Sequence, residues 1–316
     1  MNMNPPILTL VIPCYNEHEV LPETNRRMVE LVGALVNVGK IAAGSQVMYV
    51  DDGSKDNTWQ LIKTFSEQST LVKGIKLSAN RGHQTALMAG LFAASGEVVI
   101  SVDADLQDDL GAIEQMLDAY RAGNEIVLGV RKQRDVDTVF KRNSAQIYYR
   151  LLSALGVKVV YNHADYRLLG RRALDALKQY SEVNLFLRGI VPLLGFRTTT
   201  VFYDRAERFA GESKYPLRKM LMLALDGITS FTAFPLRLIS VMGLTVSVIS
   251  AMMVVWVLWV KLFTSEALPG WASSVIPIYV LGGIQLLSIG VLGEYVAKIY
   301  SETKRRPRYF IEETSG

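Results

Sequence analysis

The stretch "VVISVDADLQDD", residues 98–109, decides the fold because a run of mostly apolar residues leads directly into a group of acidic ones. Residues 98–102 have the composition of a buried strand, and the carboxylates that follow are those of Asp103, Asp105, Asp108 and Asp109. Carboxylates this close repel one another unless a cation or water separates them. In open α/β sheets, ligands bind at the carboxyl ends of the strands. We therefore expect an α/β protein with a cation site at the end of this strand.

Short apolar runs alternate with helical patterns over the first two hundred residues. The runs that predict strands are Ile7–Ile12, Val47–Val50, Gly74–Leu77, Val98–Val102 and Ile126–Leu128. The patterns that predict helices lie near 18–38, 56–68, 83–95 and 109–122. This alternation favours a parallel sheet covered by helices on both faces. Neither a GxGxxG nor a GxxxxGK[ST] motif is present, which disfavours a dinucleotide-binding fold or a P-loop.

The acidic residues differ in what their spacing predicts. Asp103 and Asp105 are two residues apart, so extended backbone points both to the same side, where they can hold one Mg²⁺ or Mn²⁺ that bridges a pyrophosphate. Asp108 and Asp109 precede a helical pattern, and we interpret them as helix caps. Asp51 and Asp52 end another strand, where they form either part of a turn or a second part of the site.

The composition indicates contact with an anionic surface or ligand. Half of the 316 residues are hydrophobic, the mean hydropathy is +0.20 and the net charge is +4. This composition is unusually apolar for a soluble enzyme, and the net charge is mildly basic. Neither value tells whether the anionic partner is a nucleic acid or a membrane. The single cysteine, Cys14, excludes an intrachain disulfide and is interpreted as a packing residue. The N-terminus lacks the pattern of a signal peptide, so we expect the first domain to fold in the cytosol.

Two long uncharged stretches predict a transmembrane hairpin, at about 238–260 and 270–293. A helix of 23 residues spans roughly 35 Å, enough for a hydrocarbon core of roughly 30 Å. Tryptophan and tyrosine lie toward the short link, where the membrane interface favours aromatic side chains. Lysine and arginine gather before the first stretch and after the second. The positive-inside rule then predicts that both chain ends are cytosolic.

Five motifs, "VIPCYNE", "VDDGSKDNT", "NRGHQTALMAG", "DADLQDD" and "GESKY", occur in this order, with "FPLRLIS" leading into the apolar stretches. Together they resemble the polyprenyl-phosphate branch of the family 2 glycosyltransferases of GT-A fold, which includes bactoprenol glucosyltransferases and dolichol-phosphate mannose synthases. The resemblance implies a Rossmann-like α/β GT-A domain over 1–212, with an amphipathic segment at 138–156. An interface helix at 213–234, two transmembrane helices within 235–300 and a cytosolic tail at 301–316 complete the expected chain.

The resemblance further implies an inverting transfer of a hexose to undecaprenyl or another polyprenyl phosphate, with Mg²⁺ or Mn²⁺. UDP-glucose is the first expected donor; GDP-mannose, N-acetylated sugars and a 4-amino-4-deoxyarabinose donor remain alternatives. The expected setting is the cytosolic face of the inner membrane, and O-antigen modification of lipopolysaccharide is an expected use of the product. No nucleic acid is expected as a partner. A homo-oligomer such as a tetramer is expected, in which residues 306–313 could add a strand between subunits.

Site residues follow from matching motif positions and from charge. The expected nucleotide-sugar contacts are Pro13, Tyr15, Glu17, Asp51 and Asp103, and the expected metal ligands are Asp103, Asp105 and Gln107. Two anionic substrates require cations, and the expected contacts of the acceptor phosphate are Arg131, Arg142, Arg208, Ser213 and Lys214. Asp105, Asp165 and Arg131 are the candidate catalytic residues. Asp165 is either a base or a carboxylate that orients arginine or lysine.

Two rival readings belong to other classes of protein. A processive polysaccharide synthase usually needs more spans and an Arg-Trp pair, which this chain lacks. A non-catalytic membrane scaffold would have no reason to keep Asp103, Asp105 and Gln107 together. Activity and its loss on substitution of Asp105 distinguish the enzyme from the scaffold.

Overall fold

The computed structural model describes residues 4–132, 163–182, 187–204, 234–263 and 271–316. The chain divides into two compact units. One consists of residues 1–216 and 305–316, and the other of residues 217–304. The predicted amphipathic segment at 138–156 and most of the one at 213–234 lie outside the described residues.

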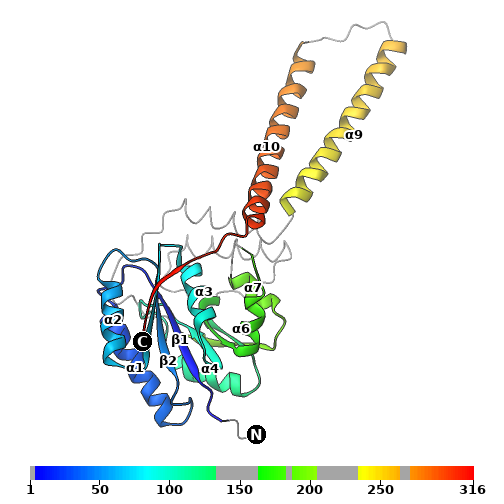
Figure 1. Ribbon diagram of the computed structural model, residues 1–316. Helices are drawn as coiled ribbons and strands as arrows, with labels where there is room; N and C mark the ends of the chain where they lie inside the picture. The colour runs from blue at the N-terminus through cyan, green and yellow to red at the C-terminus, as the bar shows by residue number, and fades with distance from the viewer. Residues whose placement is uncertain (1–3, 133–162, 183–186, 205–233, 264–270) are drawn as a thin grey trace. The chain divides into compact units, whose positions relative to one another are not determined.

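A twisted sheet forms the centre of the first unit (Figure 1). Its strand order is β7-β5-β6-β4-β1-β2-β3-β8. The strands are β1 (Leu8–Cys14), β2 (Gln46–Asp51), β3 (Val72–Leu77), β4 (Val98–Ser101), β5 (Ile126–Arg131), β6 (His163–Gly170), β7 (Thr198–Tyr203) and β8 (Ile311–Ser315). The five predicted strands all form, with bounds that differ by a few residues at most.

The sheet is mixed, which corrects the expectation of a parallel sheet. Strands β1 to β4 pair in parallel as predicted. Strand β6 runs antiparallel to both β4 and β5, and β8 runs antiparallel to β3. Because β6 enters the sheet from the opposite direction, its amino end lies at the same edge as the carboxyl ends of β4 and β5. This reversal brings the start of β6 next to the acidic stretch.

Helices cover both faces of the sheet, as the alternation predicted (Figure 1). Those of the first unit are α1 (Leu21–Asn37), α2 (Thr58–Gln68), α3 (His83–Ala93), α4 (Gly111–Arg121), α6 (Arg171–Lys178) and α7 (Leu187–Leu193). Residues Leu8, Leu10 and Ile12 of β1 belong to the core that α1 and α4 complete. On the other face, a side chain at Gly90 of α3 would overlap Val11, so the glycine lets α3 pack closely against β1.

Strand β8 pairs with β3 in the sheet of its own chain. From the sequence, residues 301–316 were expected to form a tail, in which residues 306–313 could add a strand between subunits. Glu313 fixes the pairing from the side: it accepts hydrogen bonds from Trp59 Nε1 at 2.8 Å and from Lys63 Nζ at 2.7 Å. The sequence shows no alternation of hydrophobic and polar residues in this strand, because only one of its side chains, that of Ile311, is strongly apolar. Residues 305–316 therefore belong to the same unit as the first strand.

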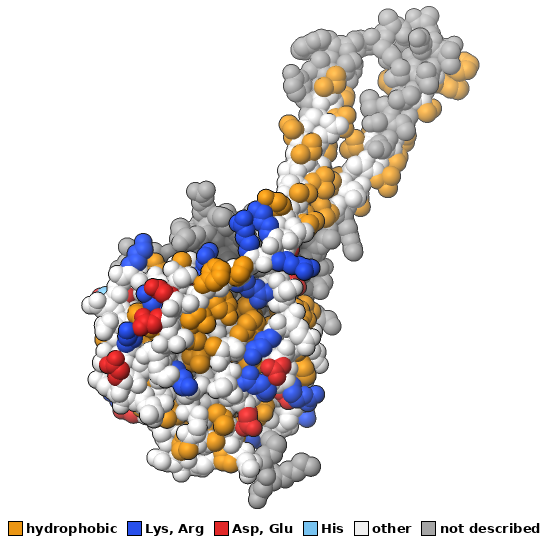
Figure 2. Space-filling model, viewed as in Figure 1, with side chains coloured by type: hydrophobic (Ala, Val, Ile, Leu, Met, Phe, Trp, Pro, Cys, Tyr) orange, Lys and Arg blue, Asp and Glu red, His pale blue; other side chains and the backbone are white. Residues whose placement is uncertain are grey.

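The second unit contains two long helices, α9 (Phe234–Phe263) and α10 (Trp271–Thr303). Many of their large apolar side chains are exposed, as Figure 2 shows in orange; they include Val241, Leu244, Met252, Val255, Leu286 and Ile289. Among the described residues, no helix meets both the length and the apolar character that a membrane crossing requires. The transmembrane hairpin stays a prediction.

Removing β8 should destabilise the first unit. We expect a chain that ends at Phe310 to lose about 2 kcal/mol or more of unfolding free energy, because the β3 edge loses its hydrogen-bonded partner, which lowers the Tm by roughly 4–8 °C. Circular dichroism during heating measures this. Glu312→Ala in the full chain is the control: its ion pair with Lys76 is half-exposed, and the Tm should barely change. An equal Tm for the truncated chain would contradict a stabilising role of β8.

Candidate functional site

The candidate site lies where polar residues from several strands meet at one edge of the sheet. Strands β1, β2, β4 and β5 end there, and β6 begins there. Ser101 pairs with Arg167, so Asp165, two residues before Arg167, lies level with Asp103, two residues after Ser101. Arg131 ends β5 at the same edge. The structure thus brings together three predicted site residues from segments far apart in the sequence.

The loop that carries Asp103, Asp105 and Gln107 is held in a defined shape. Leu106 has a φ of 56°, a conformation that L-residues rarely adopt, while its side chain packs into the core. The Asp105 carboxylate accepts a hydrogen bond from the backbone N–H of Gln107 at 3.3 Å. The buried hydroxyl of Thr24, on α1, donates to the carbonyl oxygen of Ala104 at 2.8 Å. Packing of Leu106 in the core and one buried hydrogen bond from α1 therefore hold the loop in place.

Carboxylates lie close together at this loop. Burial raises the pKa of Asp103, and the charges of Asp165 and Asp105 raise it further, while His83 and Arg131 oppose the rise. No group of three or more histidine, cysteine, aspartate or glutamate side chains suited to a metal ion occurs within the described residues. Mg²⁺ commonly binds through one or two carboxylates, water and substrate phosphates. Asp103, Asp105 and the amide oxygen of Gln107 fit that kind of incomplete site.

Asp108 is not a helix cap, contrary to the interpretation from the sequence. Its side chain turns inward, is 5% exposed and accepts a hydrogen bond from the Tyr203 hydroxyl at 2.7 Å. Burial raises the pKa of Asp108 to about 6, and the charge of Asp103 adds to the rise. Asp109 does lie at the start of α4, where its carboxylate accepts a hydrogen bond from the backbone N–H of Gly111 at 2.8 Å. One of the two acidic residues therefore acts at the helix start.

Asp165 is the centre of a buried ion cluster. Its carboxylate accepts hydrogen bonds from Arg188 Nε at 3.3 Å and Arg188 Nη2 at 2.9 Å, and a further one from Arg167 Nη2. Gln84 Nε2 donates to the same carboxylate at 3.3 Å. Burial would raise the pKa of Asp165, but the charges of Arg188 and Arg167 outweigh it and hold the pKa well below its ordinary value. Of the two roles expected for Asp165, this geometry favours orienting arginine over acting as a base.

The loops after β1 and β2 are tied together. The Asn16 N–H donates to Ser54 Oγ at 2.9 Å, and Asn16 Oδ1 accepts from the Lys55 N–H at 2.9 Å. Asp51 is fully buried and accepts weak hydrogen bonds, at 3.3 Å, from the Ser54 N–H. Of the other expected nucleotide-sugar contacts, Pro13 is buried in β1 and Tyr15 is 40% exposed beside it, while Glu17 is part-buried. Their contact with a nucleoside stays a prediction.

Asp52 positions the start of α3, a role that sequence reasoning left open. Its two carboxylate oxygens accept hydrogen bonds from the backbone N–H groups of Arg81, at 2.7 Å, and Gly82, at 2.8 Å. His83 follows, with Nε2 at 3.6 Å from Asp103 Oδ1 and at 3.8 Å from Asp165 Oδ2. Asp52 therefore places an imidazole between the two carboxylates.

The expected acceptor-phosphate contacts are described only in part. Arg131 is part-exposed, and its Nε donates to the Tyr203 hydroxyl at 3.3 Å. The other four, Arg142, Arg208, Ser213 and Lys214, lie outside the described residues. Sequence reasoning missed His83, Gln84, Arg167, Arg188 and Tyr203. The motif "NRGHQTALMAG" contains the first two, whereas no local pattern marks the others.

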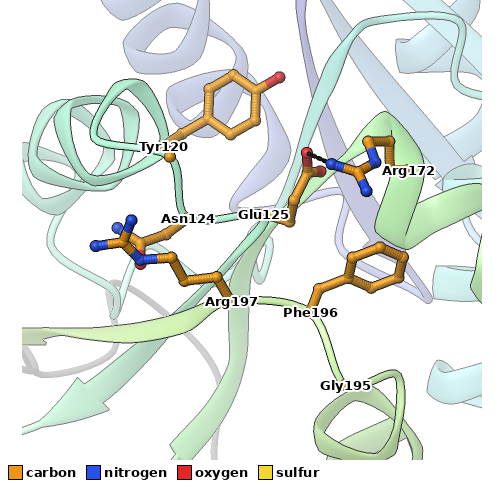
Figure 3. A pocket seen from close by; sticks show the side chains of 8 residues that line it. Tyr120, Asn124, Glu125, Arg172, Gly195, Phe196 and Arg197 are labelled. Carbon is orange, nitrogen blue, oxygen red and sulfur yellow. Dashed lines mark ion pairs between the residues drawn. The ribbon is translucent and has the colours of Figure 1, made fainter.

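A cleft of about 440 Å³ lies elsewhere, at the opposite edge of the sheet (Figure 3). It is lined by residues that precede β5 and β7 or follow β6, which is the edge away from the acidic loop. The Cζ atom of Arg172 lies 5.5 Å from the centre of the Phe196 ring, and its Nη1 lies 3.7 Å from Glu125 Oε1. Since ligands of α/β sheets bind at the carboxyl ends of the parallel strands, this cleft is not the candidate active site.

The raised pKa of Asp108 predicts a pH dependence of stability. The folded chain binds this proton more tightly than the unfolded chain, where the pKa is near 3.8, so the contribution to stability is full below pH 4 and is lost as the pH rises to about 6. Relative to wild type, Asp108→Asn should gain on the order of 1–3 kcal/mol of unfolding free energy across that window.

Urea unfolding of both chains at several pH values, in EDTA, measures the difference. Asp109→Asn is the matched control, because its exposed carboxylate lies one residue away, and it should keep the wild-type profile. Parallel profiles for Asp108→Asn and wild type would show that folding leaves the pKa of Asp108 unchanged.

Comparison with known proteins identifies the family. Residues 9–178 match the sequence pattern of the family described as glycosyl transferase family 2. The chain is 49% identical to the uncharacterized glycosyltransferase YkoT of Bacillus subtilis, over 99% of this chain and 93% of that protein. It is 38% identical to the SfII prophage-derived bactoprenol glucosyl transferase of Shigella flexneri, over 97% of this chain and 98% of that protein. The family match includes the acidic loop, both relatives match nearly the whole chain, and the chain belongs to glycosyl transferase family 2.

Proposed function

We propose that this glycosyltransferase transfers a hexose from a nucleotide-sugar to a polyprenyl phosphate, with UDP-glucose as the first donor to test. The observation that supports it most is the similarity to a bactoprenol glucosyl transferase along nearly the whole of both chains. The site agrees with the chemistry: Asp103 and Asp105 face the edge where a donor diphosphate would lie, and Arg131 and Arg188 add positive charge nearby. The same transfer from another nucleotide-sugar donor is the second candidate.

The reaction breaks the bond between the anomeric carbon and the diphosphate oxygen and forms one to an oxygen of the acceptor phosphate. That phosphate is already anionic at pH 7 and attacks without giving up a proton, so a strong base is not needed. Asp103, Asp105 and Gln107 would hold a divalent cation, which neutralises charge on the departing nucleoside diphosphate when bound. Arg131 would bind phosphate, and the fixed shape of the acidic loop keeps the carboxylates in place.

The acceptor implies a membrane setting for the second unit. We propose that α9 and α10 insert as a hairpin in the cytoplasmic membrane, with the first unit and both chain ends in the cytosol. Their exposed apolar side chains and the basic residues Lys304, Arg305 and Arg306 after α10 support this. A homo-oligomer, such as a tetramer, is a further proposal that mass measurement in detergent would test.

The reaction is tested by incubating the purified full chain with radiolabelled UDP-glucose and undecaprenyl phosphate. We expect label in the lipid fraction with Mg²⁺ or Mn²⁺ and none with EDTA. Asp105→Asn should lower the rate on the order of 100-fold or more, because a carboxylate ligand is lost. Asp109→Asn, a neighbouring carboxylate that only meets the start of α4, should keep it. Label in the lipid from GDP-mannose but not from UDP-glucose would identify GDP-mannose as the donor. No label from any nucleotide-sugar would favour the non-catalytic scaffold.

The hairpin is tested by single-cysteine labelling, with Cys14 replaced by serine. A membrane-impermeant maleimide added to spheroplasts should label Ser265→Cys, in the link between α9 and α10. Asp204→Cys, exposed at the end of β7, should be labelled only after lysis. Labelling of both positions, or of Asp204→Cys alone, in intact spheroplasts would contradict the proposed orientation.

A further inference from the structure

A buried tyrosine, Tyr203, joins the acidic loop to Arg131. Its hydroxyl donates to Asp108 Oδ1 at 2.7 Å and accepts a hydrogen bond from Arg131 Nε at 3.3 Å. A guanidinium can only donate, so the hydroxyl oxygen accepts from Arg131 and the hydroxyl proton goes to Asp108. Tyr203 is 1% exposed, so water hardly competes for these bonds. One hydroxyl thus ties Arg131 to the loop that carries the expected metal ligands.

Strand pairing and packing fix the position of this hydroxyl. Arg131 and Tyr203 are register partners in the parallel pair of β5 and β7, so their side chains leave the same face of the sheet. The ring of Tyr203 belongs to the buried core, where it meets the ring of Tyr166 edge to face at 5.1 Å. The hydroxyl is therefore in place beside Arg131 before any ligand arrives.

Stability alone does not account for a carboxylate at position 108. Asp108 is 5% exposed, and its Oδ2 has no hydrogen-bond partner among the residues that the structure describes. Burying a carboxylate with an unsatisfied oxygen costs free energy, and the charge of Asp103 lies close by. A carboxylate does have one advantage here. It only accepts, so it draws the Tyr203 proton away from Arg131, whereas an amide could turn its nitrogen toward the hydroxyl.

Arg131 lies among carboxylates but is held by a neutral group. Burial would lower the pKa of this guanidinium, but Tyr203 and the charges of Asp108 and Asp103 raise it overall. Its Nε nevertheless binds the hydroxyl. That bond uses only the Nε donor, and the two Nη groups are the pair that matches two oxygens of a phosphate. An arginine already held in one orientation loses less freedom when it binds.

We propose that Tyr203 is a positioning residue, which orients the Arg131 guanidinium for the phosphate of the acceptor. Asp108 takes part by fixing the direction of the Tyr203 hydroxyl. This inference rests on the proposed function, in which Arg131 contacts the acceptor phosphate.

Steady-state kinetics with the purified full chain test it, with UDP-glucose and undecaprenyl phosphate varied separately. The pH is kept above the pKa of Asp108, which burial raises to about 6. Tyr203→Phe keeps the ring and removes the hydroxyl. It should raise the KM for undecaprenyl phosphate about 5- to 30-fold and leave the KM for UDP-glucose within about twofold. Arg131→Lys should also raise the acceptor KM, and Tyr203→Phe should add little to it, because no guanidinium is left to orient.

Tyr166→Phe is the matched control. Tyr166 is also buried, and its hydroxyl donates to the carbonyl oxygen of Asp109 at 3.0 Å, in the same part of the chain as Asp108. Each tyrosine variant loses one hydrogen bond to this segment, so both should lower the Tm by a similar amount. The bond of Tyr166 does not lead to Arg131, and Tyr166→Phe should keep the wild-type kinetic constants. A purely structural role of Tyr203 would make the two variants alike in kinetics as well.

An unchanged acceptor KM in a folded Tyr203→Phe chain would overturn the inference. So would a rise confined to the KM for UDP-glucose, or the same fold-change beside Arg131→Lys as in the wild-type chain. Uridine diphosphate binding by calorimetry checks the fold of each variant. If Tyr203→Phe fails this check, Asp108→Asn decides: a rise of a few-fold in the acceptor KM supports the inference, and no rise overturns it. Absence of transfer by the wild-type chain would instead refute the proposed function.

Discussion

The repulsion between carboxylates that converge on one sheet edge is the constraint on which the site depends. The structure relieves it in three different ways. Asp165 is neutralised by arginine, and Asp108 is buried against the Tyr203 hydroxyl with a raised pKa. Asp103 and Asp105 remain part-exposed. Two of these chemically identical groups therefore support the architecture, and the other two lie at the site where the sequence predicts a cation.

The scaffold behind the site is organised to keep these groups in place. Asp52 holds the start of α3 through two backbone N–H groups, and Thr24 reaches the acidic loop from α1. Both side chains are almost fully buried, so their hydrogen bonds do not compete with water. The positive φ of Leu106 persists because its side chain is anchored in the core. Local backbone strain at the loop is thus stabilised by packing.

The sequence predicted the first half of the fold well, because buried parallel strands leave continuous apolar runs such as 98–102. It missed β6, whose run "HADYRLLG" mixes charged and apolar residues since Asp165 and Arg167 neutralise each other inside the protein. It also missed β8, whose place depends on pairing with a strand more than two hundred residues away. Asp103 and Asp105 were identifiable from spacing. Arg188 was not, because its contact with Asp165 forms only when folding brings the two side chains together.

The return of the chain to the sheet at β8 has a topological consequence. Strands β7 and β8 belong to the same unit, so everything between them is an insertion whose two ends are anchored on one body. Any membrane that this insertion enters must be crossed an even number of times, whatever the number of helices. A descendant that gained or lost a single crossing would have to pull β8 out of the sheet. Strand β8 therefore limits the evolution of the insertion to changes that keep the number of crossings even.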